Sequence, residues 1–226
     1  MKNDELIGAL VRDLAPVTPL PLPVARATAW AAAACALGGV VVTTLGLRSD
    51  LRHAAATPAF QAHLALLLVA TFSAAGVALV LAMPGERLSG WLRLTPLAAV
   101  AAWLAWLGAE LGIVALWHPS TPLAVDAGWG CIGKALAVGL APGVVLTVMI
   151  GRGAPMDMRR AAMFAGLAAA GVGALGVELA CPKTSPMHLL VWHAGPALAL
   201  VLAATLFGGS MLSAVSSRVR PTGRLG

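Results

Sequence analysis

Six long apolar runs limit what this chain can fold into. They lie at residues 27–47, 59–83, 96–117, 132–151, 161–180 and 189–212. A helix needs about 20 apolar residues to cross roughly 30 Å of hydrocarbon, and each run is long enough to do so. Charged residues make up only 11% of the chain, whereas they make up about a quarter of a soluble domain. We therefore predict an all-α protein that forms a six-transmembrane-helix bundle.

The basic residues indicate how this bundle is oriented. Because there are six spans, both termini lie on the same side of the membrane. Most of the fifteen Lys and Arg residues fall in the N-terminal leader (residues 1–26), the second and fourth loops and the tail (residues 213–226). Loops rich in Lys and Arg stay in the cytoplasm, so we predict that both termini are cytoplasmic. This topology accounts for the net charge of +6, and direct nucleic-acid binding is not expected.

Tryptophans and small residues refine the predicted bundle. Trp30 falls at the inner boundary of the first span, in the half-wet layer that indole rings prefer. Small residues recur every four positions in the fifth span, at Ala162, Gly166 and Ala170. Such stripes let helices approach closely. We interpret them as packing within one bundle, and a seam in a homo-oligomer is the alternative.

A short amphipathic segment opens the leader. Its apolar residues have the spacing of one helical face, and they are Leu6, Ile7, Leu10, Val11 and Leu14. Asn3 stands where an N-cap is needed, and Pro16 cannot continue the helix. We therefore expect an amphipathic helix that ends near Leu14. The prolines at 16, 19, 21 and 23 then predict an extended, semi-rigid tether.

The apolar face of this helix needs a surface to cover it, because a helix of about twelve residues is marginal alone in water. A helix that lies on a membrane usually carries Lys and Arg along its polar face. Here that face carries Asp4, Glu5 and Asp13 against Lys2 and Arg12, and an anionic leaflet repels acidic side chains. We therefore favour another protein as the partner, and docking on the bundle is the next alternative.

The leader also carries a recognisable run, Leu10-Val-Arg-Asp13-Leu14-Ala-Pro16-Val17-Thr-Pro19, ahead of the six spans. In this run and in its spans the chain resembles the NrsF-like family of integral-membrane anti-sigma factors, which are negative regulators of extracytoplasmic-function sigma factors. The resemblance implies a bacterial inner-membrane protein whose leader keeps a sigma factor from RNA polymerase until a signal releases it. The expected contact residues are Leu6, Ile7, Leu10, Val11, Asp13, Leu14, Pro16 and Val17.

Two cysteines are expected at the outer side of the membrane. Cys131 directly precedes the fourth span and Cys181 directly follows the fifth, so an inner loop between these spans places both at one level. That compartment is oxidising in a Gram-negative bacterium, and Lys134 and Lys183 nearby favour the thiolate form. We predict that Cys131 and Cys181 sense a signal, with a static disulfide or unrelated thiols as alternatives. Cys35 is expected to be a small packing residue.

The cysteine pair also suggests a metal. Two sulfurs are soft ligands for a thiophilic ion, and His118, Glu178 or His188 could complete the site. There is no CxxC or HxxxH spacing, so the sequence leaves a metal ion, a disulfide and free thiols open. Glu110 is the other carboxylate within a span. Because a charge there is expensive, we expect it to be protonated or paired inside the bundle.

Two other function classes remain as alternatives. A membrane thiol oxidoreductase would use the cysteine pair, but the chain lacks a CxxC motif and a second shuttle pair. A small membrane transporter would use Glu110 and Glu178 with helix breaks at Pro142 and Pro196, but it would not explain the leader. We therefore predict an anti-sigma factor and not an enzyme. The NrsF-like resemblance favours a redox or heavy-metal signal at the cysteines.

Overall fold

The structure is a computed structural model, and it describes residues 3–12, 19–85, 88–117 and 127–219. It confirms the predicted fold class, because the described residues form helices and no strand, and six of the helical segments are long and apolar enough to cross a membrane. The elements are α1 (Asn3–Arg12), α2 (Pro23–Leu45), α3 (Leu51–Ala55), α4 (Pro58–Leu81), α5 (Gly90–Trp117), α6 (Trp129–Gly151), α7 (Met158–Ala180), α8 (Pro186–His188), the π-helix η1 (Leu189–Ala194) and α9 (Gly195–Val219).

The first and last spans are longer than the sequence predicts. Helix α2 begins at Pro23, because proline has a φ that suits the first helical position and needs no hydrogen-bond acceptor there. Residues 23–26, which the sequence assigns to the leader, therefore form the first turn of α2. Helix α9 continues past Leu212 to Val219, because no proline or glycine interrupts that stretch.

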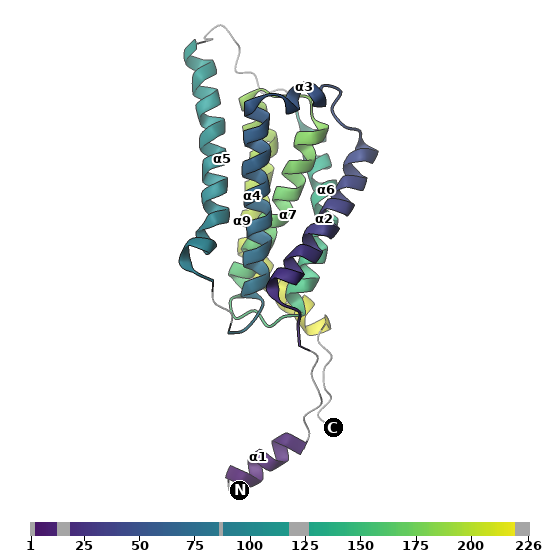
Figure 1. Cartoon of the computed structure of the whole chain (residues 1–226), viewed down its shortest axis with the longest axis vertical. Helices are drawn as coiled ribbons and strands as arrows, with labels where there is room; N and C mark the ends of the chain where they lie inside the picture. Colours follow the sequence, from purple (N-terminus) through teal and green to yellow (C-terminus); the bar gives the residue numbers. More distant parts are fainter. Residues whose placement is uncertain (1–2, 13–18, 86–87, 118–126, 220–226) are drawn as a thin grey trace.

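Helix α7 is the centre of the bundle (Figure 1). Its span is 78% buried, whereas the other spans are between 6% and 44% buried. Helices α2, α4, α6 and α9 pack against it, and α5 packs mainly against α4 at the periphery. Small residues allow this close packing: a Cβ added at Gly173 would lie 2.5 Å from the carbonyl oxygen of Ala135 on α6. On the predicted stripe, Gly166 faces Ala204 of α9 in the same way.

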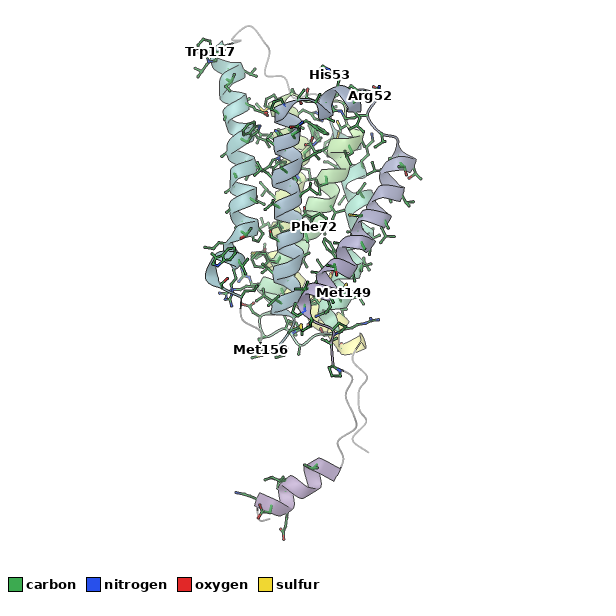
Figure 2. The ribbon with its side chains drawn as sticks, in the orientation of Figure 1. Arg52, His53, Phe72, Trp117, Met149 and Met156 are labelled. Atoms are coloured by element: carbon green, nitrogen blue, oxygen red, sulfur yellow. The ribbon has the colours of Figure 1, made fainter. Side chains whose placement is uncertain are left out.

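The bundle has two ends, which are named here by what they carry. The tether end is where α2 begins, and Figure 2 shows Met149 and Met156 there. The cysteine end is the opposite one, at which α6 begins and α7 ends. Arg52 and His53 lie at the cysteine end in the same view.

The Trp30 side chain is turned into the bundle and is not exposed to the half-wet layer that the sequence had suggested for it. The side chain is completely buried and packs edge-on against Phe72, with the ring centroids 6.0 Å apart. The indole Nε1 donates a hydrogen bond to the carbonyl oxygen of Pro142, at 3.0 Å. Since the N–H finds its acceptor inside the bundle, it does not need the interface.

We expect Gly139→Ala to destabilise the bundle by about 1–3 kcal/mol, the usual effect of overpacking. The added Cβ would lie 2.5 Å from the carbonyl oxygen of Ala169, so α6 and α7 would have to separate. Thermal unfolding in detergent, followed by circular dichroism, measures the effect. Gly133→Ala on the same helix is the matched control, because no atom lies within 4 Å of its added Cβ. Equal melting temperatures for the two variants would contradict this packing.

Candidate functional site

Cys131 and Cys181 meet at the cysteine end of the bundle. Their Sγ atoms are 3.4 Å apart, and both side chains are buried. Cys131 lies in the first turn of α6, and Cys181 directly follows the last residue of α7. The sequence placed both residues at one level, and the structure puts their sulfur atoms in contact.

Two histidines complete a cluster around the sulfurs. The Nε2 atom of His188 is 3.5 Å from Sγ of Cys131 and 3.7 Å from Sγ of Cys181. His193 joins them, so that one ligand atom from each of the four residues lies within 4.8 Å of the others. All four residues are buried. Two sulfurs and two imidazole nitrogens are a ligand set of tetrahedral zinc sites, so these residues could hold a thiophilic metal ion.

The π-helix η1 brings the two histidines together. In an α-helix, residues five positions apart are about 140° out of alignment around the axis. A π-helix instead bonds residues five apart, as the N–H of Gly195 does with the carbonyl of Leu190. The rings of His188 and His193 therefore lie 5.5 Å apart. Pro196 favours this wider turn, because proline offers no N–H and clashes with the carbonyl four residues earlier.

Glu178 lies beside this cluster, where it contacts His193. Its Oε1 atom is 3.3 Å from Nδ1 of His193 and 4.0 Å from Nδ1 of His63 on α4. A carboxylate that accepts the Nδ1 proton fixes the imidazole so that Nε2 can bind a metal. The sequence suggested Glu178 as a direct ligand, and the geometry instead makes it the residue that orients His193.

A second carboxylate extends the polar array into α5. Nε2 of His63 is 3.2 Å from Oε2 of Glu110, and Nε1 of Trp106 donates to the other oxygen of Glu110 at 2.8 Å. Glu110 is thus paired inside the bundle, one of the two states that the sequence left open. These contacts connect α4 and α5 to the helices that carry the cluster.

Arg48 braces the same end, and the sequence reasoning missed this role. Its guanidinium binds both carboxylate oxygens of Asp50, at 2.7 and 2.9 Å. It also donates to the carbonyl of Pro182 at 3.3 Å, and the backbone N–H of Arg48 donates to the carbonyl of Leu179 at 2.9 Å. The segment after α2 is therefore fastened to the end of α7, next to Cys181.

The environment of Cys181 stabilises its thiolate. Burial raises the pKa of this thiol, but the neighbouring His193 imidazole and the backbone of Lys183 favour the thiolate more strongly and lower the pKa from 9.0 to about 7. The thiolate is the nucleophilic and metal-binding form.

Lys134 joins the start of α6 to the end of α7, because its Nζ donates a hydrogen bond to the carbonyl of Ala180 at 3.0 Å.

The remaining predicted residues fall into three groups. In α1, the side chains of Leu6, Ile7 and Val11 are exposed, and Leu10 belongs to the same helix. Cys35 is exposed on α2, so its predicted packing role is wrong. Several predicted residues lie outside the part of the chain that the structure describes, and they are Asp13, Leu14, Pro16, Val17 and His118.

We expect Cys181 to react with iodoacetamide as a thiol of pKa about 7. Its labelling rate should rise through neutral pH and level off above it, because the thiolate forms above the lowered pKa and is lost below it. Peptide mass spectrometry over a pH series measures the rate. In His193→Gln the rise should move to higher pH, because the imidazole that lowers the pKa of the thiol is lost. A wild-type rate that still climbs at pH 9.0 would contradict this assignment.

Comparison with known families identifies the chain. A family model named NrsF, described as negative regulator of sigma F, matches residues 10–213. No curated protein and no solved structure matches the chain. The match covers the last three residues of α1 and nearly all of the six spans, and it confirms the resemblance seen in the sequence. The chain therefore belongs to the NrsF family, the negative regulators of sigma F.

Proposed function

We propose that this negative regulator captures an extracytoplasmic-function sigma factor with its leader and releases it when a soft metal ion binds the cysteine end. The observation that carries the proposal is the convergence of four buried sulfur and nitrogen ligands, Cys131, Cys181, His188 and His193. They lie at the end of the bundle opposite the one where the tether enters α2. The protein thus has a site for a signal on one side and a site for a partner on the other, and no catalytic role is assigned.

The charge pattern supports one orientation in the membrane. Arg152, Arg159 and Arg160 lie around the short loop between α6 and α7 at the tether end. The cysteine end carries Arg48, Arg52, Lys134 and Lys183, fewer basic residues than the tether end with its leader, loops and tail. By the positive-inside rule the leader is cytoplasmic and the cysteines face the outer side of a bacterial inner membrane.

The exposed face of α1 suits capture of a protein. Leu6 is 46% exposed, and Ile7 and Val11 are each 58% exposed, so the bundle does not cover them. An amphipathic helix of this kind binds by laying its apolar face into a groove on a partner. Asp4 and Glu5 in the first turn suit the helix dipole, and they disfavour an anionic membrane surface.

The cluster favours a metal ion over a disulfide as the signal. Two thiolates and two neutral imidazoles bring a divalent ion to zero net charge, so the loaded site can stay buried without an unpaired charge. A disulfide would draw the sulfurs from 3.4 Å to about 2.0 Å and release two protons and two electrons to an oxidant. That reaction would leave His188 and His193 without a part in sensing.

The size of the required effect is modest. A tenfold weakening of sigma-factor binding corresponds to about 1.4 kcal/mol of coupling between the two sites. Forming metal bonds at the end of α6 and α7 supplies more than this, since structural zinc sites contribute about 10–16 kcal/mol.

Ile7→Glu should weaken sigma-factor binding more than tenfold, because a charge would replace an apolar side chain worth roughly 1.5–3 kcal/mol when buried. Binding of the purified sigma factor to the full-length protein in nanodiscs measures the loss. Glu5→Gln on the opposite side of α1 is the matched control and should bind as the wild type does. Unchanged binding by Ile7→Glu would rule out the apolar face of α1 as the capture surface.

The purified protein should bind one Co²⁺ ion with the absorption of a tetrahedral thiolate complex. His193→Gln should weaken this binding by about tenfold or more, because a ligand is lost, and Cys131→Ser should weaken it further. Cys35→Ser, which alters a cysteine far from the cluster, is the control. Equal Co²⁺ binding by His193→Gln and the wild type would contradict His193 as a ligand, and a wild type that binds no Co²⁺ would contradict the metal site as a whole.

A further inference from the structure

Arg26 is buried at the tether end of α2, where a guanidinium is unexpected. Its side chain is only 5% exposed, and its Nη2 donates a hydrogen bond to the carbonyl oxygen of Met149 in the last turn of α6. Its Nη1 atom is buried and has no hydrogen-bond partner within the described residues. A buried guanidinium with one nitrogen that lacks a hydrogen-bond partner is costly. The hydrogen bond from Arg26 to Met149 can therefore be opened at little cost once water reaches the guanidinium.

Trp30 holds the same two helices one turn further into the bundle. Its Nε1 donates to the carbonyl of Pro142, at 3.0 Å, about two turns before Met149 on α6. The indole is completely buried. Arg26 and Trp30 therefore bind two carbonyls along one side of α6, and we call this pair of hydrogen bonds the clasp.

The two ends of α6 connect the clasp to the sensing cluster. Helix α6 runs without interruption from Trp129 to Gly151, a length of about 35 Å. Its first turn contributes Cys131 to the cluster, and its last turn contributes the Met149 carbonyl to the clasp. A shift or rotation of α6 at Cys131 must therefore change the geometry at Met149 or be absorbed by a bend near Pro142.

The clasp also lies where the leader enters the bundle. The tether enters α2 at Pro23, so Arg26 is in the first turn that follows it. We propose that α6 transmits occupancy of the cysteine end to the leader by opening the clasp of Arg26 and Trp30, which frees the base of α2. This inference rests on the proposed function, because it takes the cluster as the sensor and α1 as the capture helix.

The experiment uses the full-length protein in nanodiscs, with Cd²⁺ as the probe and two measurements. Hydrogen exchange of residues 23–30 reports the clasp, and sigma-factor affinity reports the output. In the wild type, Cd²⁺ should speed exchange of this segment and lower the affinity by about tenfold. In the double variant Arg26→Met and Trp30→Phe, exchange should already be fast, and Cd²⁺ should change neither quantity. Cd²⁺ affinity itself should stay within about twofold, because the cluster is untouched.

Thr28→Ala is the control, because this exposed residue bonds only within its own helix, to Ala25, and it should behave as the wild type. If Cd²⁺ leaves exchange of residues 23–30 unchanged in the wild type, or if the double variant responds as fully as the wild type, the clasp is not the route. If Cd²⁺ changes the hydrogen exchange of residues 23–30 but not the sigma-factor affinity, the clasp does respond to the cysteine end. The proposed function is then contradicted, and the inference about the clasp is not.

Discussion

The close approach of α6 and α7 is the contact on which the rest of the structure depends. It needs glycine, since a Cβ at Gly139 or Gly173 would lie 2.5 Å from a backbone oxygen of the facing helix. Because the two helices are consecutive and antiparallel, the same approach brings the start of α6 and the end of α7 together. The 3.4 Å contact between Cys131 and Cys181 is therefore a result of backbone packing deeper in the bundle, at Gly139 and Gly173.

Buried ionisable side chains are expensive in a membrane, and within the described residues they gather in two places. The first is the cysteine end, where His193, Glu178, His63 and Glu110 contact one another in series. Glu178 and Glu110 each contact a histidine, so neither of these carboxylates is unpaired in hydrocarbon. The second is the clasp at the tether end. Helix α6 contacts both places, through Cys131 in its first turn and the Met149 carbonyl in its last.

The sequence predicts the spans well and the site only in part. A long apolar run that crosses a bilayer must satisfy its own backbone hydrogen bonds, which a helix does. The six helices therefore follow from length and composition. The level shared by Cys131 and Cys181 follows from simple topology. His193 could not be found, because α-helical spacing places it away from His188 and only the π-turn at η1 aligns them. The one sign of the π-turn in the sequence was Pro196, which indicates that the helix is interrupted but not that the interruption is a π-turn. The burial of Trp30 and Arg26 could not be predicted, because burial depends on partners that the sequence does not show.

The central claim is that a metal ion on one side of the membrane controls sigma-factor binding on the other. The most direct measurement uses vesicles that hold the protein in a single orientation, with sigma factor on the leader side and Cd²⁺ added to one side at a time. The account predicts that Cd²⁺ on the cysteine side releases the sigma factor and that the same dose on the leader side does not. Release from the leader side alone, or from neither side while Cd²⁺ is bound, would contradict it.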